Sequence, residues 1–133
     1  MKDSKIKVLM VEPHKLPKVT MLDRSLDALQ KAVSIGAESQ GLIEIIPLEN
    51  NVCLLCNEEG KLIGLEGNRR LGRDIIAGTF YICGDSKSGA LCSLSEENIR
   101  KYTILFSLPE TFTDEEVQAC MLLNVFFDDD NEE

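Results

Sequence analysis

Short apolar runs separated by turn residues constrain the fold of this chain more than any other feature of its sequence. Six runs of five to nine residues are rich in Val, Ile and Leu, a composition typical of β-strands. They cover residues 5–12, 18–22, 42–48, 52–56, 61–65 and 75–83. Most of the segments between them are too short for a helix, so consecutive runs are expected to pair as hairpins in a mainly antiparallel sheet.

Helical patterns occur at three places between and after these runs. Each begins at a Ser, Thr or Asp that can cap a helix, and apolar residues follow at helical spacing. The predicted helices run from Asp23 or Ser25 to about Ser34, from Ser93 or Ser95 to about Ser107, and onward from a capping box between Thr113 and Glu116.

This order of elements predicts an α+β domain. Its mainly antiparallel sheet has about five to six strands, with one helix after the first hairpin and two C-terminal helices. We place a single domain at residues 1–108 and treat residues 109–133 as a C-terminal helix and acidic tail appended to it.

Turn residues complete the predicted sheet. Pro47 places residues 42–48 at an edge or a strand end, because proline cannot donate a hydrogen bond to a neighbouring strand. The turn from Asn57 to Gly60 is expected to join two strands, residues 52–56 and 61–65. Residues 66–73 are expected to form a loop, and Gly78 a bulge or close approach inside one strand, residues 75–83.

The net charge of −9 is concentrated at the end of the chain. Residues 109–133 hold nine acidic and no basic residues, whereas residues 1–108 are balanced. Without clustered Lys and Arg we expect no direct binding to nucleic acid. The acidic end is either a solvated terminus or a surface that binds a basic partner protein. The partner-binding candidates are Asp128, Asp129, Asp130, Glu132 and Glu133.

Catalytic and metal-binding patterns are absent from the sequence. The single histidine, His14, lies between Pro13 and Pro17 in a turn, where a solvated side chain is more common than a general base. Cys53 and Cys56 have C-x-x-C spacing but lie in a strand, so their side chains are expected on opposite faces and in the core. We therefore expect no enzyme, no metal and no cofactor.

The cysteine count and the hydropathy bear on the compartment. Five cysteines, an odd number, are typical of a reducing compartment. No apolar stretch is long enough for a signal peptide or a membrane span. We expect a cytoplasmic protein without a membrane partner. The apolar segment from Cys120 to Phe127 is broader than one helical face requires, so a homodimer could form through it.

An arginine cluster is the main candidate for a ligand site. Three of the five arginines lie within five positions of a predicted loop, and glycines nearby would let a ligand approach the backbone. The candidate ligand-binding residues are Asn68, Arg69, Arg70, Arg73 and Gly78. The alternative is that Arg69 or Arg70 pairs with Asp74 or Glu66 and orders the loop.

Several short motifs occur in an order that resembles a known family. They are Val11-Glu-Pro13, Leu26-Asp-Ala-Leu-Gln30, Ile43-Glu44, Asn57-Glu-Glu-Gly-Lys-Leu62, Asn68-Arg69 and Asp74-Ile-Ile-Ala-Gly-Thr-Phe80. Over residues 5–106 the sequence resembles small proteins of phages and plasmids of Firmicutes, known only as a domain of unknown function. The surroundings of His14 and residues 34–40 depart from that pattern.

The resemblance implies a context and no catalytic residue. A member of this family would be the product of a mobile-element accessory gene in a bacterial cytoplasm. Our leading hypothesis is a non-enzymatic protein that binds a host macromolecule, most plausibly a host protein, with a counter-defence role. The alternative hypothesis is a binder of a small nucleotide-like ligand that holds phosphate through Arg69, Arg70 and Arg73.

Overall fold

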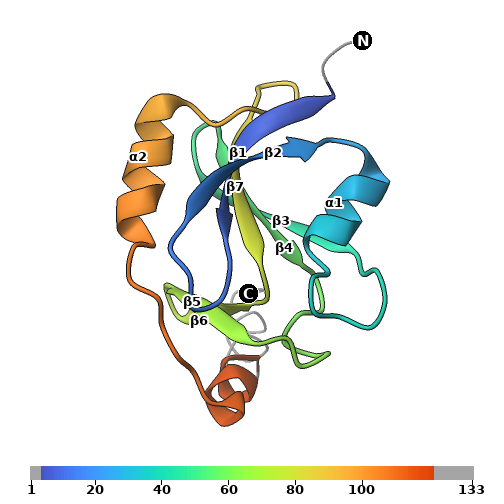
Figure 1. The fold of residues 1–133 in the computed structure, drawn as a ribbon, viewed down its shortest axis with the longest axis vertical. Coiled ribbons are helices and arrows are strands. Elements are labelled where there is room, and N and C mark those ends of the chain that lie inside the picture. Colours follow the sequence, from blue (N-terminus) through green and yellow to red (C-terminus); the bar gives the residue numbers. More distant parts are fainter. Residues whose placement is uncertain (1–3, 122–133) are drawn as a thin grey trace, which may run out of the picture.

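The computed structural model describes residues 4–121, and its main feature is a twisted antiparallel sheet (Figure 1). The strand order is β2-β1-β7-β4-β3, and β8 pairs with β7. The bounds are β1 (Lys5–Val11), β2 (Lys18–Asp23), β3 (Ile43–Glu49), β4 (Val52–Asn57), β7 (Phe80–Asp85) and β8 (Leu91–Cys92). Every side chain of β7 up to Gly84 is buried, which fits its place in the middle of the sheet.

One helix covers each face of the sheet (Figure 1). Helix α2 (Glu96–Leu105) places Ile99, Tyr102 and the following Phe106 over one face, in a cluster with Leu54 and Phe80. Helix α1 (Leu26–Ala32) covers part of the other face, where Leu29 and Val33 pack with alternate strand residues, including Cys53, Leu55 and Tyr81. Because successive strand residues point to opposite faces, β4 contributes to both clusters.

A separate hairpin lies below the main sheet in Figure 1. It consists of β5 (Gly67–Leu71) and β6 (Asp74–Ala77), and the chain after Thr113 coils against it. The helical residues 114–121 bring Val117 and Cys120 onto Ile75, with Phe112 packed beside them. This third cluster attaches the C-terminal helix to the hairpin.

The predicted α+β class, the first hairpin and the helices are confirmed. Ser25 and Ser95 are the N-caps of α1 and α2, each accepting a hydrogen bond from a backbone N–H three residues on. The capping box also forms: the Glu116 N–H donates to Thr113 Oγ1 at 3.1 Å, and the Thr113 N–H donates to Glu116 Oε1 at 2.7 Å. Pro47 lies in the edge strand β3.

The predicted strand at residues 61–65 is wrong. The chain turns there instead: the Ile63 N–H donates to the Glu59 carbonyl and the Leu65 N–H to the Gly60 carbonyl. Leu62 and Ile63 face outward, so this apolar run is not a strand of the core. Strand β4 pairs instead with β3 and β7.

The predicted loop at residues 66–73 and the single strand at residues 75–83 are also wrong. Residues 67–71 form β5, and the long strand divides into β6 and β7 at Gly78. Gly78 adopts φ +86, a left-handed conformation that ends β6, and its N–H donates to the Glu66 carbonyl at 2.7 Å. The chain therefore leaves the hairpin and enters the main sheet at this residue.

Candidate functional site

Arg69, from the predicted arginine site, is buried in the centre of a hydrogen-bond network. Its side chain is 1% exposed. Nε and Nη2 donate to the Phe106 carbonyl, Nη2 also to the Lys15 carbonyl, and Nη1 to the carbonyl and side-chain oxygens of Asn68. These five hydrogen bonds match the five N–H groups of a guanidinium. Burial lowers the pKa of Arg69 from its ordinary value.

Asn68 is equally buried and connects Arg69 to Gly78. Its side-chain amide donates to the carbonyls of Val11 and Gly78, both at 2.9 Å, while its oxygen accepts from Arg69. The structure thus brings three of the five predicted ligand-binding residues together inside the protein. None of the hydrogen bonds of the Arg69 side chain goes to Asp74 or Glu66. Its N–H groups donate to backbone carbonyls and to the Asn68 side chain.

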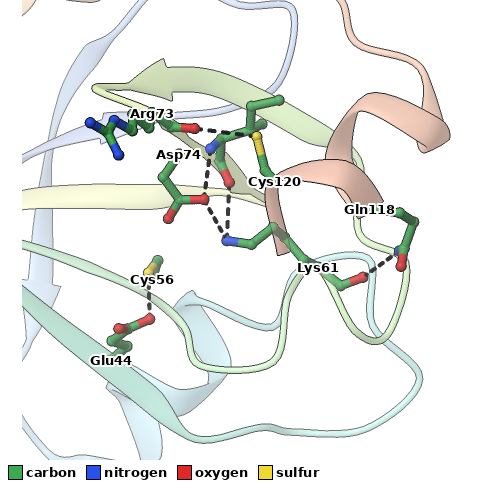
Figure 2. Close-up of polar contacts among 8 residues, drawn as sticks. Glu44, Cys56, Lys61, Arg73, Asp74, Gln118 and Cys120 are labelled. Carbon is green, nitrogen blue, oxygen red and sulfur yellow. Dashed lines mark hydrogen bonds and ion pairs between the residues drawn. The ribbon is translucent and has the colours of Figure 1, made fainter. Parts of the chain in front are cut away.

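Arg70 and Arg73 lie on the outside of the hairpin. The Arg70 guanidinium is 5.5 Å from the centre of the Phe112 ring, and its backbone N–H donates to the Glu110 carboxylate at 3.2 Å. The Arg73 side chain points away from Lys61 and Asp74, while its carbonyl accepts from the Cys120 thiol (Figure 2). The three arginines therefore do not converge on one point.

A different site forms where the hairpin approaches the edge of the main sheet. Figure 2 shows Glu44 and Cys56 on one side and Asp74 and Lys61 on the other. They line a cavity of about 240 Å³, which we name the acidic pocket. Four acidic residues line it, Glu44, Glu58, Glu59 and Asp74, and its apolar lining is Cys56, Leu62, Ile76, Ala77 and Met121.

Among residues 4–121, Lys61 is the one basic residue that lines the acidic pocket, and it is already paired. Its ammonium lies 3.0 Å from Asp74 Oδ1 and donates to the Ile75 carbonyl at 3.2 Å. The Lys61 carbonyl accepts from the Gln118 side chain, so the C-terminal helix holds this turn in place (Figure 2). With Asp74 and Lys61 neutralising each other, three glutamates give the pocket a negative charge.

The cysteines occupy structural positions. As expected, Cys53 and Cys56 lie on opposite faces of β4, in different clusters. Burial raises the pKa of the Cys53 thiol to about 11 and that of Cys56 to about 12, where Glu44 adds to the effect. Both are therefore protonated thiols at neutral pH. In residues 4–121 no group of His, Cys, Asp and Glu side chains is arranged to hold a metal ion.

We predict that the native protein resists thiol alkylation at most of its cysteines. Cys53, Cys56, Cys83 and Cys120 are buried, and only Cys92 is partly exposed. At pH 8, iodoacetamide should modify Cys92 first and the other four at least about tenfold more slowly, because alkylation needs an accessible thiolate. Mass spectrometry against a urea-unfolded control measures this. Rapid modification of Cys53 or Cys56 in the native protein would contradict the placement of these thiols.

His14 lies in the turn between β1 and β2 with φ +67. Its side chain is about half exposed, as expected for a turn residue, but its Nε2 contacts the Glu66 carboxylate. The turn is therefore attached to the segment that precedes β5.

The sequence does not predict the acidic pocket, whose lining residues are spread over positions 44–121. Glu44, Glu58 and Asp74 are far apart in the sequence and belong to no local motif. Their proximity depends on the hairpin of β5 and β6, where the sequence predicts a loop. The predicted partner-binding residues and most of the predicted dimer segment lie outside the described residues; the former are Asp128, Asp129, Asp130, Glu132 and Glu133. Within that segment, Cys120 packs on the hairpin.

The fold and these contacts define a small α+β domain with a mixed apolar and acidic cavity and an internal arginine network. The chain belongs to the family described as Domain of unknown function (DUF3846), whose model matches residues 6–107. No curated protein and no solved structure shows significant similarity to it. None of the helices within residues 4–121 has the length and hydropathy needed to cross a membrane.

Proposed function

We propose that this protein is a non-enzymatic binding protein that engages a basic surface of a partner protein. The observation that supports this proposal is the acidic pocket, where an apolar lining lies beneath several carboxylates. A lysine or arginine side chain has the matching character, since its aliphatic stem favours apolar contacts and its charged head favours carboxylates. The net charge of −9 would add long-range attraction for a basic partner.

The geometry of the pocket favours a side chain over a flat surface contact. Cys56, Ile76 and Ala77 are buried at its base, while Glu58 and Glu59 are exposed at its rim. A side chain that enters would lose water around its stem and keep its charge beside the rim. Such a buried anchor with a charged head is typical of the residues that dominate protein–protein binding energy.

The proposal includes a biological setting. The sequence motifs resemble small phage and plasmid proteins, which supports a mobile-element accessory protein in a bacterial cytoplasm. In that setting the partner would be a host protein, for example one with a defence role. Direct contact with nucleic acid is not part of this proposal, since the net charge of −9 would repel a phosphate backbone.

The small-ligand alternative has less support in the geometry. A phosphate site built from Arg69, Arg70 and Arg73 would need all three guanidinium groups on one ligand, but Arg69 uses all five of its N–H groups inside the protein. Arg70 and Arg73 alone would have to hold the phosphate. We therefore favour the protein partner.

A charge-neutralising pair of variants tests the proposal. In Glu58→Gln/Glu59→Gln, the affinity for a fluorescein-labelled arginine-rich peptide should fall about tenfold at 150 mM salt, because two charge contacts worth about 0.5–1 kcal/mol each are lost. Fluorescence anisotropy measures the dissociation constant. The control, Glu38→Gln/Glu97→Gln, removes the same charge from exposed positions elsewhere and should change affinity less than twofold. An equal loss in both variants would show unspecific attraction and reject the pocket.

A further inference from the structure

Strand β2 is a free edge of the main sheet, and within residues 4–121 it pairs with β1 alone. In an antiparallel pair, only every second residue of a strand exchanges hydrogen bonds with the residue opposite. The Arg24 N–H donates to the Ser4 carbonyl at 2.8 Å, at the end of this ladder. Counted from there, the residues of β2 that bond to β1 are Lys18, Thr20 and Leu22. The N–H and C=O groups of Val19 and Met21 therefore point away from the sheet.

Contacts on the far side of β1 agree with this alternation. The Lys7 N–H donates to the Ser93 hydroxyl at 2.9 Å, and the Lys7 carbonyl accepts from the Leu94 N–H at 2.9 Å. Lys7 therefore bonds away from β2, and Met21, which lies opposite it, makes no hydrogen bond to it. Within the described residues no other group binds the backbone N–H and C=O of Val19 and Met21. These groups are free to pair with a further strand.

The two edges of the sheet differ in how they are protected against such pairing. The other edge, β3, contains Pro47 and a shift in register between Pro47 and Glu49, and its Glu44 is exposed. Proline, register shifts and charged side chains hinder the addition of a strand. Strand β2 pairs with β1 without a shift, and its charged residues, Lys18 and Asp23, lie at its two ends. The middle of β2 therefore lacks these protections.

Apolar side chains are exposed along the same edge. Val19 lies opposite Leu9, which belongs to the cluster beneath α2, so Val19 and Met21 are on the face that this helix covers. The helix does not reach them, since they are 49% and 55% exposed. Leu16 before the strand and Leu26 after it are exposed as well. Exposed apolar side chains beside unpaired backbone groups are typical of an edge that pairs with another strand.

We infer that β2 pairs with β2 of a second copy of this chain, antiparallel about a two-fold axis at Thr20, so that the dimer has one continuous sheet. An axis perpendicular to the sheet keeps the same faces together and places one residue opposite itself. With the axis at Thr20, Val19 of each copy lies opposite Met21 of the other. Because both residues have outward-pointing backbone groups, each such pair exchanges two hydrogen bonds, and the apolar side chains pack together.

Charge favours this register over the neighbouring one. With the axis at Met21, Lys18 of each copy would lie opposite Arg24 of the other, and like charges directly opposite are destabilising. With the axis at Thr20, Lys18 lies opposite Leu22 instead, and no two like charges of the paired strands face each other. The sequence of β2 is therefore complementary to itself in one register.

The inference does not depend on the proposed basic partner. Strands β2 and β3 are at opposite edges of the sheet, and the acidic pocket forms beside β3 and β4. Pairing through β2 leaves the two acidic pockets of a dimer accessible at the outer edges of the joined sheet. A partner with two basic sites would then bind the dimer more tightly than one copy alone.

Sedimentation velocity of the full-length protein over a concentration series tests the pairing. Val19→Lys/Met21→Lys places lysines opposite each other in both pairs, so the dimer dissociation constant should rise at least about tenfold. Val19→Lys/Met21→Glu changes the same exposed positions but places lysine opposite glutamate, so it should dimerise at least about tenfold more tightly than the double-lysine variant. The control Ile104→Lys/Leu108→Lys adds the same charge at exposed positions elsewhere and should change the constant less than about twofold.

Hydrogen exchange followed by NMR tests the register. The amides of Val19 and Met21 should be protected at least about tenfold more in the parent dimer than in the double-lysine variant. The amides of Thr20 and Leu22, which bond to β1, should stay protected in both and show that the hairpin is intact. A parent protein that is monomeric at about 1 mM would overturn the inference. So would equal dissociation constants for the double-lysine variant and either the parent or the lysine–glutamate variant, or a β2 that pairs only with an unrelated extended peptide.

Discussion

Replacing Arg69 with alanine is expected to lower the free energy of unfolding by about 3–5 kcal/mol, the range for removing one partner from a buried charged network. The loss has two sources. The Phe106 and Lys15 carbonyls lose the donors that now satisfy them, and the Asn68 side-chain oxygen loses its donor as well. A space the size of an arginine side chain also opens between β5, the β1–β2 turn and the end of α2.

The position of Arg69 adds to its importance. Phe106 is the C-cap of α2, and its carbonyl belongs to the negative end of the helix dipole, where a cation is favourable. Arg69 therefore attaches the hairpin to α2. Arg69→Lys should restore only part of the stability, because one ammonium cannot replace five donors in a planar arrangement.

Urea denaturation followed by circular dichroism measures this effect. The matched control is Arg70→Ala, the neighbouring arginine on the exposed side of β5, which should cost less than about 1 kcal/mol. Similar losses in the two variants would contradict the buried network. So would an Arg69→Ala protein as stable as the parent.

Replacing Gly84 with alanine is expected to lower the free energy of unfolding by about 2–4 kcal/mol, as for other forced shifts in a packed core. A Cβ at this position would lie 2.5 Å from the Ser93 carbonyl oxygen and 3.0 Å from that of Cys92. These are backbone atoms, so relief requires a movement of the chain. The segment cannot move freely, since the Leu94 N–H donates to the Lys7 carbonyl and Leu94 is buried in the core beneath α2.

Gly89→Ala is the control for this prediction. Gly89 has φ +88 but no atom within 4 Å of an added Cβ, so only the backbone conformation is penalised, by about 1–2 kcal/mol. Thermal unfolding of the two variants should place Gly84→Ala clearly lower. If Gly84→Ala has the same midpoint of thermal unfolding as the parent protein, β8 does not pack on β7 as described.

The order of elements could be predicted because local signals agreed with the fold. The β1–β2 hairpin, the caps Ser25 and Ser95 and the capping box at Thr113 rest on nearby residues and are confirmed. Residues 61–83 failed because their structure depends on distant partners. Gly78 was expected to mark a bulge or a close approach inside one strand; the Leu65 side chain does approach it closely, but the Gly78 N–H donates to the Glu66 carbonyl and the strand divides there.

The site was predicted less well than the fold, for a related reason. An arginine cluster in sequence suggests a surface site, yet alternation along β5 buries Arg69 and exposes Arg70. Only knowledge that residues 67–71 form a strand could have shown that Arg69 is buried and Arg70 is exposed. The acidic pocket joins residues from β3, β4 and β6, and its composition follows from a hairpin that the sequence pattern did not indicate.

The most direct test of the proposed function is to map where a basic peptide binds. ¹⁵N-labelled protein titrated with an unlabelled arginine-rich peptide should show saturable shifts at the amides of Cys56, Gly60, Lys61 and Ala77, which line the acidic pocket. In Glu58→Gln/Glu59→Gln the same shifts should reach saturation only at about tenfold higher peptide concentration. Shifts confined to residues 128–133 or to any other part of the protein, with the acidic pocket silent, would contradict the account.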